Sequence, residues 1–358
     1  MGLPLITEAA SWRLGQTGTV TGEVRRRPAI GAHVKVAGGL ATRGLQHARE
    51  VGAEAIQVFV SNPRGWALAA GDPRQDDAFV EQVAAGGIPT LVHAPYLVNL
   101  GSPNPATVEQ SRRSVEHSLR RAASLGAAGI VVHTGSAVDH EHREEAMRQV
   151  REGLLPLLDA IPDGGPYILL EPMAGQGESL CATVIDLGDY FDVLGDHPML
   201  GVCLDTCHAY AAGHDLATPG GMTATLDELV RTVGDGRLRA VHANDSKDGL
   251  GSCRDRHENI GAGHIGVDAF AELLAHPAVQ GIPVLIETPG DRASDAKDIA
   301  ILKGLRDRTT PDPAAAAGER TGRRGVPDVE RRAVRAVRPG AVRAVQRRQR
   351  SAVSSRRR

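Results

Sequence analysis

Short apolar runs recur along the chain, and each one ends in a polar residue or a turn. Eight such runs occur, at residues 29–33, 55–59, 90–93, 129–133, 167–171, 201–205, 238–242 and 283–287. Runs of this length, bounded by turn signals, are typical of strands that are buried on both faces of a sheet. Their successive ends lie 26 to 45 residues apart, which leaves room for one helix and two loops between neighbours.

The stretches between the runs carry the helical signal. Apolar residues recur there at three- and four-residue intervals, for example over residues 107–125 and 142–160. Eight strands that alternate with helices match the (β/α)8 TIM barrel, an α/β fold, in number and in length. A doubly wound sheet is the alternative, and the count of eight favours the barrel over it.

The two ends of the chain lack this pattern. Residues 1–28 show no periodicity, so we expect a disordered leader or a translational start placed too far upstream. From Pro311 the composition shifts to Ala, Arg, Val, Gly and Pro. We therefore expect a single barrel domain over residues 29–305 and a disordered, Arg-rich tail over residues 306–358.

Composition points to a reduced, aqueous environment. Hydrophobic residues make up 41% of the chain but aromatic residues only 3%, so aliphatic side chains must fill the core. The four cysteines form no Cys-x-x-Cys pair, and no apolar run approaches the length of a membrane span. We expect reduced thiols and a cytoplasmic protein.

Charge is distributed unevenly along the chain. From Pro311 onward there are 14 Arg, no Lys and four acidic residues, a net charge of +10, whereas residues 1–310 carry a net charge of −12. An acidic body disfavours a broad nucleic-acid surface unless bound cations neutralise its carboxylates. The tail is either a basic arm for phosphate contacts or an extension without a role. The second is favoured because the tail has neither aromatic residues nor a periodic apolar face.

The polar residues that close the runs form one chemical set. They are His33, His93, His133, Glu171, Asp205, His242 and Glu287. Strands buried on both faces rarely carry ionisable side chains, and the carboxyl ends of barrel strands are where active sites lie. Any one of these residues fits an ordinary core or loop position, but seven of them at strand ends indicate a functional site.

The segment around residues 242–257 adds further candidates. Asp255 and His257 are two residues apart, so on an extended segment they point the same way, and His208 follows the run at 201–205. Ten candidates exceed the three or four ligands of one catalytic zinc, so we expect two or three Zn²⁺ or Mn²⁺ ions. Clusters in which a carboxylate such as Glu171 bridges two ions hydrolyse phosphate esters.

Several longer motifs resemble endonuclease IV. They are GAHV at 31–34, AGG at 37–39, AGQG at 174–177, GVCLDTCHA at 201–209, HANDSK at 242–247, GS at 251–252, DRH at 255–257 and GAGHIG at 261–266. The resemblance covers roughly residues 29–305. It implies a (β/α)8 enzyme with three zinc ions that cuts duplex DNA 5′ to abasic sites, leaving a 3′-hydroxyl and a 5′-deoxyribose phosphate, and that trims blocked 3′ ends. The implied nucleophile is a metal-bridging hydroxide, and a monomer is expected.

Carried over position by position, the resemblance implies a ligand set for each ion. The first zinc takes His93, His133 and Glu171; the second takes Glu171, Asp205, His242 and Glu287; the third takes His208, Asp255 and His257, with Mn²⁺ an alternative at one site. Glu171 and Glu287 are the expected catalytic carboxylates. His33 is not a ligand in the family, and we expect it to orient a carboxylate.

The resemblance also implies residues that enter the base stack. Arg64, Tyr96 and Leu97 match the family's inserting residues, and an apolar wedge beside a cation suits a loop that opens DNA. A missing base lowers the cost of flipping the abasic nucleotide into a pocket. The alternative for Tyr96 and Leu97 is simple packing of their loop.

Some positions depart from the common family pattern. Pro172-Met173 follows Glu171 where Asn-Thr is frequent, Thr288-Pro289-Gly290 follows Glu287, and no second histidine closely follows His133.

Two other functions remain open. A metal-dependent sugar isomerase or epimerase would share the barrel but use one or two ions, and a non-catalytic DNA-binding scaffold would leave the strand-end ring without a purpose.

Overall fold

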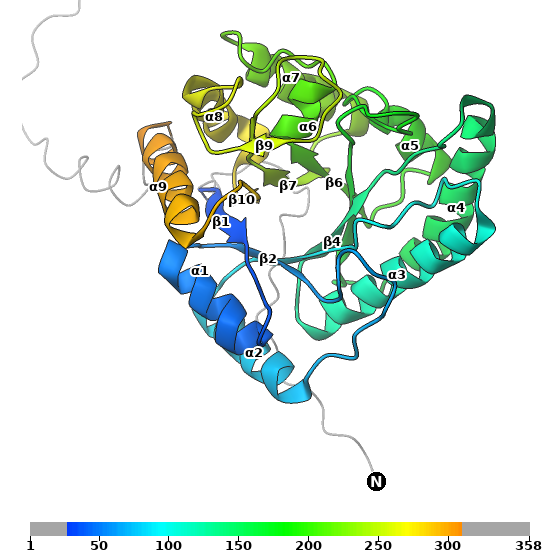
Figure 1. The fold of residues 1–358 in the computed structure, drawn as a ribbon, viewed down its shortest axis with the longest axis horizontal. Coiled ribbons are helices and arrows are strands. Elements are labelled where there is room, and N and C mark those ends of the chain that lie inside the picture. Colours follow the sequence, from blue (N-terminus) through cyan, green and yellow to red (C-terminus); the bar gives the residue numbers. More distant parts are fainter. Residues whose placement is uncertain (1–26, 310–358) are drawn as a thin grey trace, which may run out of the picture. The chain divides into compact units, whose positions relative to one another are not determined.

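Eight parallel strands close into a barrel with helices arranged around it (Figure 1). The structure is a computed structural model that describes residues 27–309, so the predicted tail from 310 onward and nearly all of the predicted leader lie outside it. The strand order around the ring is β1-β10-β7-β6-β5-β4-β3-β2. The predicted (β/α)8 barrel is therefore confirmed, and a doubly wound sheet is excluded.

All eight predicted runs form barrel strands. The strands are β1 (Ala29–His33), β2 (Ile56–Phe59), β3 (Thr90–His93), β4 (Gly129–His133), β5 (Tyr167–Glu171), β6 (Leu200–Asp205), β7 (Leu238–His242) and β10 (Pro283–Ile286). Predicted and observed ends differ by one residue at β2, β6 and β10. Two short strands outside the barrel, β8 (Asp245–Ser246) and β9 (His257–Glu258), pair in antiparallel fashion.

Helices occupy the intervals between the strands. They are α1 (Leu45–Val51), α2 (Pro73–Gly86), α3 (Pro105–Ser124), α4 (Arg143–Asp159), α5 (Leu187–Val193), α6 (Thr206–Ala211), α7 (Gly221–Val233), α8 (Val267–Ala275) and α9 (Arg292–Thr309), with short turns η1 (Leu40–Gly44), η2 (His140–His142) and η3 (Pro277–Val279). The Asn104 side chain caps α3 ahead of a first-turn proline. The predicted domain boundary at 305 falls inside α9, which continues to Thr309. Within residues 27–309, no helix is long and apolar enough to span a membrane.

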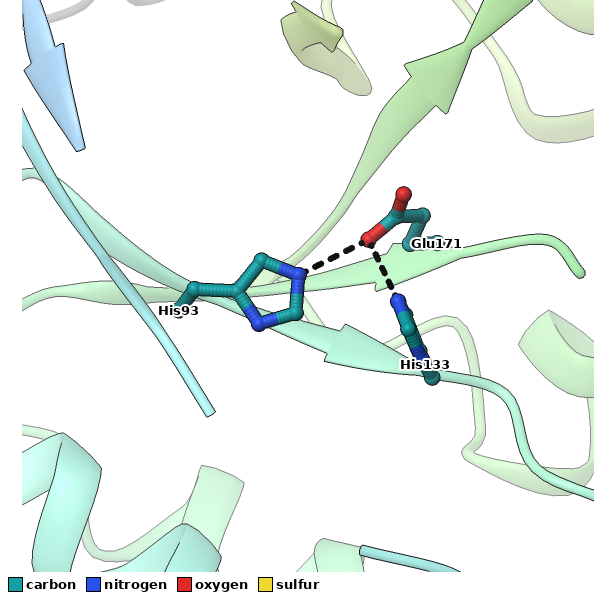
Figure 2. Close-up of side chains that lie close together, drawn as sticks. All are labelled: His93, His133 and Glu171. Carbon is teal, nitrogen blue, oxygen red and sulfur yellow. Dashed lines mark hydrogen bonds and ion pairs between the residues drawn. The ribbon is translucent and has the colours of Figure 1, made fainter. Parts of the chain in front are cut away.

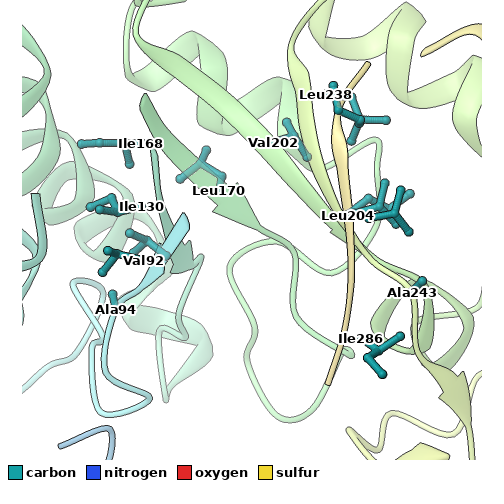
Figure 3. Close-up of a cluster of buried hydrophobic side chains, with 14 of the residues drawn as sticks. Val92, Ala94, Ile130, Ile168, Leu170, Val202, Leu204, Leu238, Ala243 and Ile286 are labelled. Atoms are coloured by element: carbon teal, nitrogen blue, oxygen red, sulfur yellow. The ribbon is translucent and has the colours of Figure 1, made fainter. Parts of the chain in front are cut away.

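Side chains alternate between two cores along each strand. Outward-facing residues such as Val92, Ile130, Ile168 and Leu170 pack in the layer between the strands and the helices (Figure 3). Inward-facing residues form a second, smaller cluster inside the barrel: Ala55, Leu91, Val131, Leu169, Cys203, Ala240 and Leu285. This two-residue period places every second side chain of a strand on the barrel axis.

Gly31 is the residue that β1 contributes to the inward-facing layer. A Cβ at this position would lie 1.7 Å from the carbonyl oxygen of Ala55, the residue just before β2, so only glycine fits. The close approach brings β1 against β2, where His33 pairs in register with Gln57. The next inward-facing layer begins at these two residues.

Candidate metal centre

A ring of eight polar side chains lies one layer above the apolar interior. Each member follows an inner-layer residue by two positions: His33, Gln57, His93, His133, Glu171, Asp205, His242 and Glu287. Seven of them are the predicted strand-end residues. The eighth, Gln57, occupies the β2 position. The strands therefore deliver one polar side chain each to the same level of the barrel.

The first candidate group joins β3, β4 and β5. The Nε2 atoms of His93 and His133 lie 3.2 and 3.3 Å from the same oxygen of Glu171, Oε2 (Figure 2). Glu171 is completely buried. The three ligand atoms lie within 4.8 Å of one another, which is the arrangement of a metal-binding triad.

The second candidate group lies on the other side of Glu171. It contains Asp205, His242 and Glu287, whose ligand atoms also lie within 4.8 Å of one another. The Nδ1 atom of His242 is 3.1 Å from Glu171 Oε1 and 3.5 Å from Glu287 Oε2. The two oxygens of Glu171 thus face different groups, which is the geometry that a bridging carboxylate requires.

The third candidate group is built from α6 and the β8–β9 hairpin. The Nε2 atoms of His208 and His257 each lie 3.2 Å from Asp255 Oδ1. Asp205 caps α6 by accepting a 3.0 Å hydrogen bond from the backbone N–H of His208. A backbone hydrogen bond of 2.9 Å between residues 247 and 256 closes the hairpin. Local backbone structure therefore positions all three side chains.

Backbone carbonyls fix the tautomers of three candidate ligands. The Nδ1 atoms of His93, His208 and His257 lie 2.6, 3.0 and 3.1 Å from the carbonyl oxygens of Ala94, Pro172 and Glu287. A carbonyl only accepts, so each Nδ1 carries a proton, and each Nε2 points into the site as the nitrogen that would bind a metal ion. The Nε2 atoms of His208 and His257 are buried, and among residues 27–309 no acceptor, the nearby Asp255 oxygen included, meets them in hydrogen-bonding geometry. This donor set fits bound metal ions.

The electrostatics of the site also favour cations. Burial acts to raise the pKa of Glu171, but the charges of His242 and His133 outweigh it and hold that pKa well below the usual range. Burial acts to lower the pKa of His257, whereas the Asp205 and Asp255 carboxylates raise it to about 9. Glu171 therefore stays ionised, and the site draws in positive charge, which protons on the histidines supply when metal is absent.

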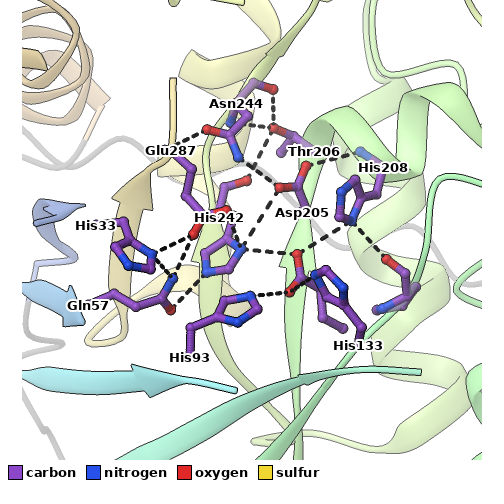
Figure 4. Close-up of polar contacts among 12 residues, drawn as sticks. His33, Gln57, His93, His133, Asp205, Thr206, His208, His242, Asn244 and Glu287 are labelled. Carbon is purple, nitrogen blue, oxygen red and sulfur yellow. Dashed lines mark hydrogen bonds and ion pairs between the residues drawn. The ribbon is translucent and has the colours of Figure 1, made fainter. Parts of the chain in front are cut away.

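Two amide side chains in the site carry no assignment from the sequence. Asn244 donates to Asp205 Oδ2 at 2.7 Å, and its Oδ1 accepts from the backbone N–H of Glu287 at 2.7 Å (Figure 4). Gln57 contacts three other members of the ring, His33, His242 and Glu287. The two-residue period of a strand could have identified Gln57 from the sequence. Gln57 follows Ala55 by two residues, just as His93 follows Leu91, so both side chains face the barrel interior.

His33 and Pro172 both contact the ligand set. His33 Nδ1 lies 2.9 Å from Glu287 Oε1, which is the contact expected of a residue that orients a carboxylate; this role stays a prediction. Pro172, a departure from the family pattern, contributes only its backbone carbonyl to His208. A side-chain change at that position therefore leaves the contact intact.

A cavity of about 280 Å³ opens beside the first and third groups. It is lined by Tyr96, His133, His208, Asp255, His257, Glu287 and Pro289. Tyr96, which lines the cavity, is 45% exposed, and the next residue, Leu97, is 37% exposed. The backbone N–H of Tyr96 donates to the Pro63 carbonyl at 3.0 Å, which ties this loop to the loop that carries the exposed Arg64. The three predicted inserting residues therefore lie on two connected loops.

Comparisons with known proteins identify the family. A protein named probable endonuclease 4 from Streptomyces coelicolor is 59% identical over 292 residues, which cover 81% of this chain and 99% of the relative. The chain belongs to the endonuclease IV family. A second probable endonuclease 4, from Methanoculleus marisnigri, is 40% identical over 282 residues, covering 77% of this chain and 98% of that relative. The model of the wider xylose isomerase-like TIM barrel family matches residues 45–308.

Solved structures agree with the endonuclease IV assignment. The crystal structure of endonuclease IV from Thermus thermophilus matches with a TM-score of 0.69 and 35% identity, covering 78% of this chain and all of that one. A D-tagatose 3-epimerase-like protein matches with a TM-score of 0.61 but only 19% identity, covering 82% of this chain and all of that one. At that identity the likeness shows the shared barrel alone.

Proposed function

We propose that this member of the endonuclease IV family is a DNA-repair enzyme. It hydrolyses the phosphodiester 5′ to abasic sites in duplex DNA, leaves a 3′-hydroxyl and a 5′-deoxyribose phosphate, and trims blocked 3′ ends. The observation that carries the proposal is the presence of three ligand groups, two of which share Glu171. Phosphate-ester hydrolysis suits such a site because several ions can contact the attacking and leaving oxygens at once.

The residues divide among three zinc ions, with Mn²⁺ an alternative occupant at one position. His93, His133 and Glu171 would hold the first; Glu171, Asp205, His242 and Glu287 the second; His208, Asp255 and His257 the third. Bound zinc would supply Lewis-acid stabilisation of phosphate charge and a nucleophile near neutral pH. Glu171 and Glu287 are the proposed catalytic carboxylates, and Asn244 holds Asp205 in place between its neighbours.

The rim of the cavity would handle the DNA. Tyr96 and Leu97 would enter the base stack as an apolar wedge, and the exposed Arg64 would contact the strand beside them. The cavity of about 280 Å³ is small, which supports a flipped sugar phosphate without a base as its occupant.

The alternative of a sugar isomerase or epimerase has less support. Such enzymes share this barrel and bind one or two ions, whereas His208, Asp255 and His257 make a third group that a sugar-converting site does not need. The epimerase-like structural neighbour shares only 19% of its residues with this chain.

The test is cleavage of a synthetic duplex that contains one tetrahydrofuran abasic analogue. We expect cutting 5′ to the analogue with a 3′-hydroxyl product, identified by mass, that is lost after prolonged chelation and restored by zinc. The same duplex with an undamaged base is the control. Absence of cutting by metal-replete protein would refute the proposal, and conversion of a ketose by that same protein would establish the sugar-converting alternative.

A further inference from the structure

Gln57 is the one ring member that is neither ionisable nor a usual metal ligand. Its side chain is fully buried on the inward face of β2, between the apolar interior and the candidate metal groups. A buried amide is costly unless its nitrogen and oxygen both find hydrogen-bond partners. The side-chain partners of Gln57 belong to the ring.

The contacts of Gln57 fix its own orientation (Figure 4). Its Nε2 lies 2.7 Å from Glu287 Oε1 and 3.0 Å from His33 Nδ1, and its Oε1 lies 3.0 Å from His242 Nε2. An ionised carboxylate only accepts, so the amide nitrogen must face Glu287 and the amide oxygen must face His242. The amide oxygen only accepts too, so His242 donates from Nε2 to Gln57. This leaves Nδ1, 3.1 Å from Glu171 Oε1, as the nitrogen whose lone pair would bind a metal ion once its own proton is displaced.

His242 differs in this respect from the other candidate histidines with a fixed tautomer. His93, His208 and His257 donate to backbone carbonyls, which the fold itself supplies. His242 depends instead on one side chain, Gln57. A single side-chain substitution can therefore remove the partner of His242 Nε2.

The other end of the same amide acts on Glu287. Its nitrogen engages Oε1, while Oε2 stays on the side of His242 Nδ1, 3.5 Å away. We propose that Gln57 is a positioning residue: it sets the tautomer of His242 and limits Glu287 to one coordinating oxygen, and by doing so it strengthens metal binding at the second group. This inference rests on the proposed metal occupancy. Outer partners of this kind typically change metal affinity by about 10- to 100-fold.

The test compares metal binding by wild-type protein, Q57M and Q57N after chelation. Methionine keeps the volume of Gln57 but loses both hydrogen bonds, and asparagine keeps the amide but withdraws it by one methylene. We expect one zinc ion to bind about 10- to 100-fold more weakly in Q57M, measured by chelator competition, with a smaller loss in Q57N. The visible spectrum of the Co²⁺-loaded protein should change in Q57M. If metal-free Q57M fails to fold, the zinc affinity of Q57N is compared with that of the wild-type protein instead, and an unchanged affinity there would contradict the proposal.

Gln280 supplies the matched control. Its amide nitrogen donates to the backbone carbonyls of Leu274 and His276 at 2.8 and 3.1 Å, ahead of β10 and away from the ring. Q280M should leave zinc affinity and the Co²⁺ spectrum unchanged. Wild-type zinc affinity and an unchanged spectrum in Q57M would overturn the inference. These readouts need no DNA, so a wild-type protein that binds zinc but cuts no abasic duplex would refute the proposed nuclease function alone.

Discussion

His242 and Glu171 face each other across the barrel interior, with Nδ1 of the histidine 3.1 Å from Oε1 of the carboxylate and both side chains completely buried. They come from β7 and β5, which are separated by β6 in the ring. A second oxygen of Glu171 contacts His93 and His133. One carboxylate therefore links two histidine-containing groups, and its charge is the centre of the site.

Glu171→Gln should abolish cleavage of the abasic duplex while the protein still folds. The substitution keeps the shape of the side chain but removes the charge that two ions would share, so we expect a loss of at least about 100-fold in kcat together with reduced zinc content. Glu178→Gln, a nearby partly exposed position, is the control. Activity near the wild-type level in Glu171→Gln would show that this carboxylate does not bridge.

The metal-free protein should lose stability as the pH rises from about 6.5 to about 9. The pKa of His257 lies above its ordinary value of 6.5, at about 9, because Asp205 and Asp255 outweigh the effect of burial. Because the pKa of His257 is higher in the folded than in the unfolded protein, its contribution to the free energy of unfolding is complete below about pH 6.5 and is lost as the pH passes about 9. Thermal unfolding of chelated protein across this pH range measures that loss. In His257→Asn, Tm should fall less steeply with pH.

The stabilisation given by zinc should grow over the same pH range. Zinc binding must displace protons from the histidines, and fewer protons compete as the pH rises. The difference in Tm between zinc-loaded and chelated protein is therefore expected to increase from about pH 6 to about pH 8. A difference that stays constant or shrinks would contradict proton-linked binding at these histidines.

Tyr96→Ala and Leu97→Ala should weaken cutting of duplex substrates without changing zinc content. Stacking of an aromatic side chain on a base contributes about 1–3 kcal/mol, so Tyr96→Ala should reduce kcat/KM by roughly tenfold or more. The loss should be smaller when a mismatched base pair flanks the lesion, because less stacking must be broken there. Ile185→Ala, another exposed apolar position, is the control. Equal losses on both substrates would favour simple loop packing.

Gly31→Ala should destabilise the barrel. A Cβ at this position would meet the Ala55 carbonyl oxygen at 1.7 Å, so β1 and β2 must separate, at a cost of about 3 kcal/mol or more. Gly188 lies in α5, and a Cβ added there would be 3.5 Å from the Thr232 side chain of α7, so Gly188→Ala should leave stability unchanged or slightly higher. Chemical unfolding of both variants measures the difference, and equal midpoints would contradict the close approach.

The strand-end chemistry is visible in the sequence because short apolar runs and their closing residues can be read without tertiary information. The run at 55–59 is the exception: it ends in Phe59, while its ring position is Gln57, two residues earlier. Only the register between neighbouring strands shows which inward layer a residue joins.

Other features of the site depend on tertiary structure. The strands β8 and β9 have two residues each, too few to show a period. The tautomers of His93, His208 and His257 depend on backbone carbonyls, whose positions no local pattern encodes. The candidate ligands follow from residue type, whereas the direction of their lone pairs follows from the fold.

The position of β10 makes the second group depend on the last strand of the barrel. This strand is the last barrel strand in the chain, yet it lies between β1 and β7 in the ring and precedes Glu287 directly. A nascent chain that still lacks β10 has an open barrel and misses one carboxylate of the second group. The second group is therefore complete only when the first and last strands of the barrel have paired.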